Sequence, residues 1–389
     1  MIQLDGKEHR IGLALSGGGF RASIFHMGVM RRLQELGILN KIDVISTVSG
    51  GSIVGAYYVL KKPNWGDILG VEEGFKKGLQ ANIRLRGLTG AVIFRPIGFA
   101  KSLLPGPTRT NVVAGEFDKH FFHGATLDQL PETPKLVINA TSLNTGAVWR
   151  FSKERMGDWK FGYGPAGEFP VKDAVGASAA VPGLFAPLVL ARKDLGKMEV
   201  SPEFGHHRRV NLSDGGVRDN QGLTNLFFED ICDYIICSDA SGLIEADPKP
   251  SKLAVQVLLR SNNITMDAAR DWIVQMLYLR KQSGKIRQMA FFDLKDEVQK
   301  GAPGLPHELV NTVANIRTDL DYFDKNEIFV LKYHGYTLAD DRIRRYAEEL
   351  IQTEDVEMKW REEFPPETIT ALKHVLRKAH KRRLRPHRF

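Results

Sequence analysis

The sequence predicts an α/β protein built on a central, mostly parallel sheet that is flanked by helices. Three observations favour this class. The 389 residues, 43% hydrophobic and 26% charged, have the composition of an ordinary globular protein. The chain opens with two successive strand–turn–helix units, and later apolar runs of strand length would extend the same sheet. Disordered and fibrous classes are excluded.

The opening segment contains the clearest elements. Residues 11–15 form a short apolar run suited to a buried strand, and residues 22–36 carry apolar side chains at helical spacing up to a glycine. A second strand at 42–48 and a second helix at 52–60 repeat this order. Connections of this length join parallel strands. Further strands of the sheet are expected at 135–139, 234–238, 253–259 and 290–294.

The C-terminal part is predicted to be helical and basic. No repeat or low-complexity linker interrupts the chain, so we expect one domain at 1–350 and a helical extension at 351–389. Residues 368–389 hold eight Lys and Arg and no acid, which accounts for the net charge of +8, since the rest has 46 basic and 46 acidic residues. Such a tail could attract anionic lipid headgroups or nucleic acid, or it could be a solvated helix end.

Cysteine content and apolar run lengths bear on location. Cys232 and Cys237 lie in a stretch typical of a buried strand, which gives no support to a disulfide scaffold or a cysteine-ligated zinc site and favours a reducing compartment. The first apolar run is shorter than a signal-peptide core, and none is long enough to span a bilayer. We therefore expect a cytoplasmic protein whose contact with membranes is at most peripheral.

Residues 84–111 form a long irregular stretch of glycine, proline and scattered large apolar residues. Long loops inside compact domains are more often functional than idle. The part at 84–104 could be a flexible apolar cap beside a site that handles acyl chains, or a buried irregular connection, and loop sequence does not distinguish the two.

A glycine cluster lies between the first strand and the first helix. Gly17, Gly18 and Gly19 place unpaired backbone N–H groups at a helix start, which makes a site for negative charge. Phosphate binding, dinucleotide binding and an oxyanion hole all use such a site. A P-loop is disfavoured because the nearest match, at 50–55, has no lysine. The dinucleotide pattern G-x-G-x-x-A is present, ending at Ala22, but no acid ends the following strand.

A serine–glycine turn follows the second strand. The sequence TVSGG at 47–51 links that strand to the next helix, which is the setting of a nucleophile elbow. Ser49 is the predicted nucleophile, and the N–H of Gly50 is available as an additional oxyanion donor. Thr47 stands where the pattern G-x-S-x-G has its first glycine, so a purely structural turn stays open as the alternative.

A serine hydroxyl is a weak nucleophile until a base takes its proton. Asp214, in the sequence DGG at 214–216, is the candidate base, although such a turn on its own is often only a turn. An ordinary triad would need a histidine, for which His26, His206 and His207 are the alternatives. No HExxH or paired-ligand spacing occurs, so we expect no metal site and no cofactor.

Taken together and in this order, the motifs resemble those of the patatin-like phospholipase family. The sequence GGGFR at 17–21 matches the family's glycine loop, TVSGG at 47–51 its elbow, and DGG at 214–216 its aspartate turn. Weaker likenesses occur at 139–146 and at 177–187, where ASAAVPGLFAP is similar to the family's A-S-x-A-x-P-x-x-F segment. The resemblance spans residues 11–350.

The resemblance implies a three-layer α/β fold and a Ser49–Asp214 dyad that works without histidine. Asp214 would deprotonate Ser49, which attacks an ester carbonyl, and Arg21 would fix the glycine loop. The oxyanion would be held by backbone amides of Gly17, Gly18, Gly19 and Gly50. The implied activity is that of a serine esterase of phospholipase A or lysophospholipase type, which cleaves fatty-acyl esters of phospholipids or related lipids.

Two other functions remain alternatives. One is a lipid-binding or regulatory protein with the same fold and little turnover, against which the presence of both Ser49 and Asp214 argues. The other is nucleic-acid binding through the tail, which no aromatic-rich RNA motif or zinc finger supports. We therefore expect a lipid substrate, peripheral contact with an anionic membrane surface and no specific nucleic acid, and the oligomeric state stays open.

Overall fold

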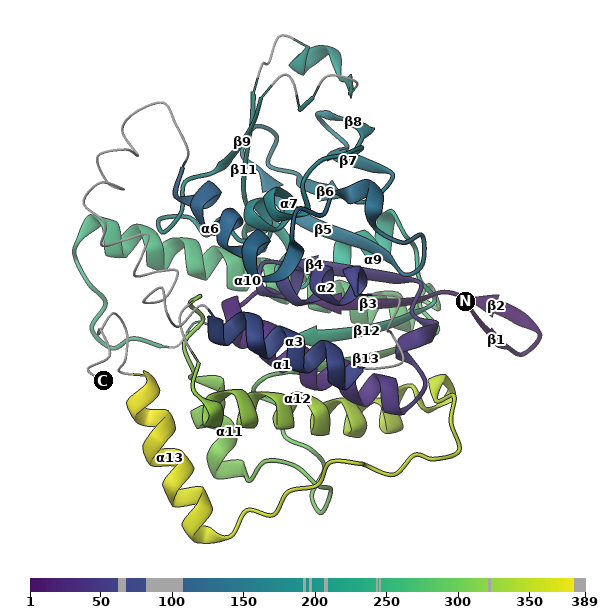
Figure 1. Ribbon diagram of the computed structural model, residues 1–389, viewed down its shortest axis with the longest axis vertical. Coiled ribbons are helices and arrows are strands. Elements are labelled where there is room, and N and C mark those ends of the chain that lie inside the picture. Colours follow the sequence, from purple (N-terminus) through teal and green to yellow (C-terminus); the bar gives the residue numbers. More distant parts are fainter. Residues whose placement is uncertain are drawn as a thin grey trace.

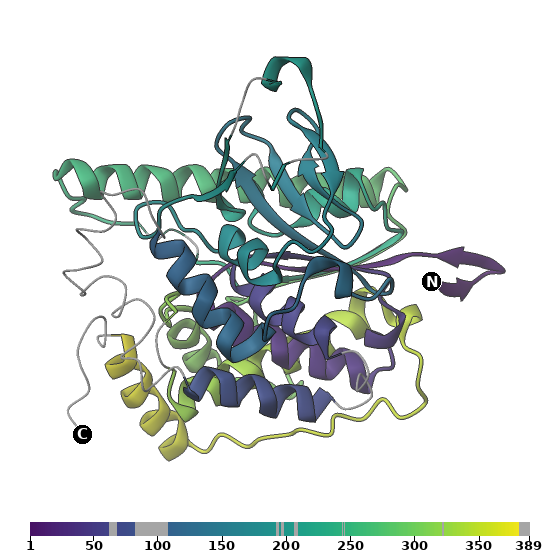
Figure 2. The ribbon, with the colours of Figure 1, turned by 45° about the horizontal axis from the view of Figure 1, so that its top comes forward.

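The computed structural model describes most of the chain, namely residues 1–61, 68–81, 108–191, 194–195, 198–205, 209–242, 244, 246–320 and 323–380. These residues form three layers, in which helices cover both faces of one large sheet (Figure 1 and Figure 2). A separate hairpin of β1 (Ile2–Leu4) and β2 (Lys7–His9) projects beside the N-terminus. The predicted α/β class is confirmed.

The large sheet has eleven strands and is mixed. One side of it is parallel, as predicted, and runs from β5 (Lys135–Ser142) through β4 (Val44–Val48), β3 (Ile11–Leu15) and β12 (Tyr234–Asp239) to the edge strand β13 (Gln288–Asp293). The other strands are antiparallel to their neighbours: β6 (Val148–Phe151), β7 (Arg155–Asp158), β8 (Gly162–Pro165), β9 (Leu188–Ala191), β10 (Glu199–Val200) and β11 (Arg209–Asp214). Most of these strands are too short for a detectable alternation of apolar residues, which is why sequence patterns do not predict them.

Helices fill the two outer layers. One face is covered by α1 (Gly19–Glu35), α2 (Gly50–Leu60), α3 (Ile68–Ala81), α6 (Arg109–Phe117), α7 (Val171–Ser178), α11 (His307–Ala314), α12 (Lys325–Tyr346) and α13 (Pro366–His380). The other face carries α8 (Gly216–Asp219), α9 (Leu223–Phe228) and α10 (Ala254–Gln282). Short helical turns lie at η1 (Leu39–Lys41), η4 (Asp118–Phe122), η5 (Leu127–Gln129), η6 (Pro202–Phe204) and η7 (Glu348–Leu350).

Two hydrophobic clusters, one on each face of the sheet, hold the layers together. In β3, Ile11, Leu13 and Leu15 belong to the cluster that includes α1 and α12, whereas Ala14 belongs to the cluster beneath α9 and α10. Alternate side chains of a strand point to opposite faces. A strand covered on both faces therefore needs a continuous apolar run, which is the signal that predicted β3 from the sequence.

The strand predicted at residues 253–259 is wrong, because these residues form the start of α10. A short apolar run fits a strand and a buried helix equally well, so its periodicity does not decide between them. The described side chains at 253–259 are exposed, so neither form of burial explains why this run is apolar. The other predicted strands and both predicted helices are confirmed, with ends shifted by a few residues.

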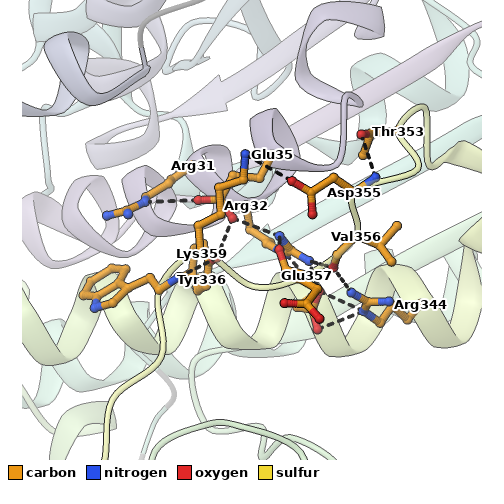
Figure 3. Close-up of polar contacts among 12 residues, drawn as sticks. Arg31, Arg32, Glu35, Tyr336, Arg344, Thr353, Asp355, Val356, Glu357 and Lys359 are labelled. Carbon is orange, nitrogen blue, oxygen red and sulfur yellow. Dashed lines mark hydrogen bonds and ion pairs between the residues drawn. The ribbon is translucent and has the colours of Figure 1, made fainter.

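The buried side chain of Arg32 hydrogen-bonds to the segment that follows α12 (Figure 3). Arg32 of α1 is fully buried and forms ion pairs with Glu35 and Asp340 at 2.9 Å and 2.7 Å. Its guanidinium also donates hydrogen bonds to the backbone carbonyls of Val356 and Glu357. Charge-assisted bonds of this kind are stronger than neutral ones. Arg32 therefore connects two helices with a segment that has no regular structure of its own.

The division of the chain into residues 1–350 and 351–389 stays a prediction. In the described part of the second segment, α13 packs against α11 and α12. The basic residues at 381–389 lie outside the described residues. None of the described helices combines the length and the apolar character needed to cross a bilayer.

We expect Arg32→Met to lower the free energy of unfolding by about 3 kcal/mol, because it removes the buried charge that pairs with Glu35 and Asp340 and that donates to two backbone carbonyls. The loss falls at the low end of the usual range, since other partners remain. Asp340 and the Val356 carbonyl keep Arg344, and Glu35 keeps Arg31 and Tyr336. Urea unfolding followed by circular dichroism measures it. The control is Lys359→Ala, whose surface ion pair with Asp355 should contribute less than about 0.5 kcal/mol. Equal stability of the two variants would contradict the prediction.

Candidate active site

Ser49 stands at a strained turn between β4 and α2. Its backbone has φ 49° and ψ −116°, a conformation that side-chain-bearing residues rarely adopt, and its side chain is almost fully buried, with 5% exposed. Strain of this kind concentrates at functional sites and is a feature of the nucleophile elbow. The local geometry around Ser49 is therefore that of an elbow and not of an ordinary turn.

The threonine at the first position of the elbow is accommodated by a glycine in the following helix. A Cβ atom added to Gly55 of α2 would lie 2.7 Å from Cγ2 of Thr47. The Thr47 hydroxyl donates to the carbonyl of Val137 in β5 and accepts a hydrogen bond from Ser52. Thr47 in place of the first glycine of G-x-S-x-G therefore causes no steric clash, because Gly55, in the second turn of α2, leaves room for the Thr47 methyl group.

The pairing of β5 brings the serine and the aspartate together. Along β5, Asn139 pairs with Val48 of β4, and the next residue, Ala140, pairs with Asp214 of β11. The opposite edge of Ala140 is occupied by β6. Because a strand has only two edges, β4 and β11 lie end to end along the same edge of β5. Ser49, the residue after β4, therefore meets the last residue of β11.

The Ser49 hydroxyl and the Asp214 carboxyl group lie beside each other at this junction. The hydroxyl is near enough to lower the pKa of Asp214 as a hydrogen-bonding neighbour, and the N–H of Gly216 donates to Asp214 Oδ1 at 2.7 Å. Burial raises the pKa of Asp214 to about 6, although these two hydrogen bonds lower it. A carboxyl group with a pKa near neutrality is suited to general-base catalysis.

Ser178, at the end of α7, links the backbones of the two residues. Its Oγ accepts a hydrogen bond from the Ser49 N–H at 2.8 Å and donates to the carbonyl of Asn139 at 2.6 Å. The carbonyls of Ser178 and Ala180 accept hydrogen bonds from the N–H groups of Gly215 and Asp214. The sequence marked residues 177–187 only as a weaker family likeness, and it carried no signal for this bridging role.

The glycine loop packs directly on the elbow. A Cβ atom on Gly50 would lie 2.0 Å from the carbonyl oxygen of Gly19, so only glycine allows this approach. The N–H of Gly17 donates to the backbone carbonyl of Asn220 at 3.0 Å. Within the described hydrogen bonds, the N–H groups of Gly18, Gly19 and Gly50 have no acceptor. The Gly17 amide is thus already engaged in this structure, and the oxyanion role of Gly17, Gly18, Gly19 and Gly50 stays a prediction.

Asn220 is a residue of this site that the sequence patterns missed. Its side-chain Oδ1 lies 2.3 Å from where a Cβ of Gly17 would be and 2.4 Å from where a Cβ of Gly216 would be. The Asn220 side-chain amide therefore packs between the glycine loop and the aspartate turn. Its position four residues after the DGG sequence is the one signal that could have drawn attention to it.

Arg21 is buried behind the glycine loop and does not face the dyad. Its guanidinium donates hydrogen bonds to the carbonyls of Ala240, Ala314 and Ile316 at 2.8–2.9 Å. Burial lowers the pKa of Arg21 to about 10, while the nearby carboxylates of Asp293 and Asp239 raise it. These contacts support the predicted role of Arg21 in fixing the loop.

Of the three histidine alternatives, the structure describes His26. His26 Nε2 hydrogen-bonds to the Ser16 carbonyl and Nδ1 to the Ser238 hydroxyl, and burial lowers its pKa to about 4. In the described part of the chain, no hydrogen bond joins His26 to the dyad. His206 and His207 lie outside the described residues, as does the proposed cap at 84–104. Among the described residues, no group of three or more His, Cys, Asp or Glu is arranged to hold a metal ion.

A comparison with protein-family models finds one match. A family model described as patatin-like phospholipase matches residues 13–227, more than half of the chain, and the match includes both Ser49 and Asp214. No curated protein matches. The family match covers the glycine loop, the elbow and the aspartate turn in one stretch.

Solved structures share the fold at low identity. Human GIVD cytosolic phospholipase A2 aligns with a TM-score of 0.54 and 15% identity, covering 98% of this chain and 62% of that chain. Its complex with methyl gamma-linolenyl fluorophosphonate inhibitor and terbium chloride aligns with a TM-score of 0.50 and 13% identity, covering 96% of this chain and 60% of that one. This chain thus spans about three-fifths of that enzyme's length. On the strength of the family match, the chain belongs to the patatin-like phospholipase family.

Proposed function

We propose that this protein is a lipid acyl hydrolase that cleaves fatty-acyl esters of phospholipids or related lipids. The observation that carries the proposal is the strand pairing that brings Ser49 beside the buried Asp214 carboxyl group, close enough to act on its pKa. A strained serine next to a carboxyl group of raised pKa is a nucleophile paired with its base. Membership of the family supports a lipid ester as the substrate.

In the first half-reaction, Asp214 takes the proton of the Ser49 hydroxyl as the oxygen attacks the ester carbonyl. The carbonyl oxygen then carries a negative charge, which nearby N–H groups stabilise. Asp214 returns its proton to the leaving alcohol, and an acyl-Ser49 ester remains. No third residue is needed, because the aspartate contacts the serine directly.

In the second half-reaction, Asp214 deprotonates a water molecule that attacks the acyl-Ser49 carbonyl. The same N–H groups stabilise the second oxyanion. Collapse of this intermediate breaks the acyl–oxygen bond, and the proton returns to Ser49, which restores the starting state. The fatty acid leaves as the second product.

The oxyanion donors are assigned to the N–H groups of Gly18, Gly19 and Gly50. Their lack of an acceptor within the described hydrogen bonds supports this assignment, whereas the Gly17 N–H would first have to give up the carbonyl of Asn220. Each such donor typically stabilises the transition state by about 2.7–4 kcal/mol. Gly17 therefore shapes the loop, together with Arg21, and does not bind the oxyanion.

The type of enzyme, its location and the roles of residues 84–104 and of the basic tail are further parts of the proposal. We propose an enzyme of phospholipase A or lysophospholipase type that works on lipid surfaces in the cytoplasm. Residues 84–104 would accept acyl chains, and the basic tail at 368–389 would favour anionic interfaces. The positive charge of that tail and the apolar composition of the 84–104 stretch support these roles.

Replacing the nucleophile should abolish covalent labelling. We expect a fluorophosphonate probe to label the wild-type protein and not Ser49→Ala, and lipid hydrolysis to fall by at least about 1,000-fold, since the nucleophile has no substitute. Gel fluorescence and fatty-acid release from a lipid panel measure the two effects. The control is Ser213→Ala, a neighbouring serine whose replacement should leave labelling intact. A wild-type protein that binds vesicles but is neither labelled nor hydrolytic would instead be a lipid-binding protein.

The pH dependence of kcat/KM should reflect the ionisation of Asp214. The pKa of Asp214 is raised to about 6, so the proton-accepting form appears only as the pH rises through that value, and kcat/KM on a soluble ester should rise with it. Asp214→Asn should lower kcat/KM by about 100-fold or more and remove the acidic limb. Initial-rate assays across the acidic range measure both. Full activity of Asp214→Asn would replace the dyad with a histidine-based scheme.

A further inference from the structure

The first half of α10 carries large apolar side chains that no described element covers. In Figure 1 and Figure 2 this end of the helix extends to the left, past the sheet. Among the described side chains of residues 249–264, none is buried. The exposed large apolar residues in this stretch are Leu253, Val257, Leu258, Leu259 and Ile264. We call residues 249–264 the docking segment.

These side chains do not contribute to the packing of α10 against the sheet, which is made by the second half of the helix. The second half of α10 buries Ile273 and Leu277 in the hydrophobic cluster on that face of the sheet. At 3.6 residues per turn, Leu253, Leu258 and Ile264 lie within an arc of about 140°, on the side of α10 that faces away from Leu277. An exposed apolar face of this kind marks an interaction site.

The positive charges around this apolar face favour an anionic partner. Lys249, Lys252 and Arg260 lie within the docking segment, and residues 248–266 contain no Asp or Glu. Apolar side chains flanked by cations match an anionic lipid surface, where the former enter the acyl boundary and the latter meet phosphate groups. A second copy of the chain would place like charges opposite one another, which opposes self-association.

The docking segment adjoins the candidate active site. A Cβ atom on Gly183 would lie 2.6 Å from Cδ2 of Leu259, so the helix touches the 178–187 segment there. That segment begins with Ser178, which accepts the hydrogen bond of the Ser49 N–H. Further along, α10 packs against α8, the short helix that follows the aspartate turn. A surface bound by the docking segment would therefore lie beside the dyad.

We propose that the docking segment binds the protein to anionic lipid bilayers or micelles. Leu253, Val257, Leu258 and Ile264 enter the interface, and Lys249 and Lys252 contact lipid phosphates. This inference rests on the proposed function, because it presents the lipid surface to Ser49.

The test compares vesicle binding with turnover of a soluble ester. Leu253→Ser/Leu258→Ser, made in the Ser49→Ala background, should lower binding to phosphatidylcholine vesicles containing phosphatidylserine by at least about tenfold in cosedimentation. In the wild-type background, the same double variant should hydrolyse a short-chain ester below its micellar concentration at an unchanged rate. Vesicle binding that is unaffected by the double substitution, or absent in the parent protein, would overturn the proposal.

A matched control lies on the same helix. Trp272 and Leu258 are both 70% exposed, and they are separated by roughly 20 Å along α10. Trp272→Ser should retain vesicle binding, because its surroundings include the acids Asp267 and Asp271. Equal loss in Trp272→Ser and in the double variant would mean that the whole helix, and not the docking segment, forms the contact, and the assignment would be wrong.

The remaining outcomes separate this inference from the proposed function. If light scattering shows a wild-type dimer that the double variant dissociates, the partner is a second copy and the lipid assignment is overturned. If the wild-type protein binds vesicles through the docking segment but does not hydrolyse the soluble ester, docking stands and the proposed hydrolase activity fails. If it hydrolyses the ester but binds no vesicles, the hydrolase activity stands and docking fails.

Discussion

The shared edge of β5 is the constraint on which the site depends. β4 ends on this edge at Asn139, and β11 takes it over at Ala140, so the residue that follows one strand meets the last residue of the other. Ser178 secures the junction, because its hydroxyl joins the Ser49 N–H to the Asn139 carbonyl. The contact between Ser49 and Asp214 thus follows from strand pairing and does not rely on mobile loops.

The same junction explains the electrostatics of the dyad. Asp214 is buried at the end of β11, so its charged form is poorly solvated and its pKa is raised. Among the described residues, the Gly216 N–H and the Ser49 hydroxyl are the groups whose hydrogen bonding lowers this pKa. A more fully bonded aspartate would ionise more readily and be a weaker base. The strained backbone of Ser49 and the raised pKa of Asp214 are both features that the surrounding core has to support.

The docking segment shows how apolar character can mislead. A run such as residues 253–259 suggests burial, and burial in an α/β protein suggests a strand. In the structure this run begins a long helix and is exposed. Its apolar side chains are therefore better explained by a partner outside the chain than by the core. The acid-free surroundings make a lipid surface the natural partner for a protein that we propose to hydrolyse lipids.

The sequence by itself determined the elements whose signals are local: β3, α1, β4 and α2 follow from apolar spacing and glycines, and the ordered motifs named Ser49, Asp214 and the family. Only the tertiary structure decided that the sheet is mixed, that the Gly17 amide is taken by Asn220, and that Ser178 bridges the dyad. The reason is physical. Spacing along a chain reflects the local geometry of helices and strands, whereas a hydrogen-bond partner or a sheet edge is fixed by residues far away in the sequence.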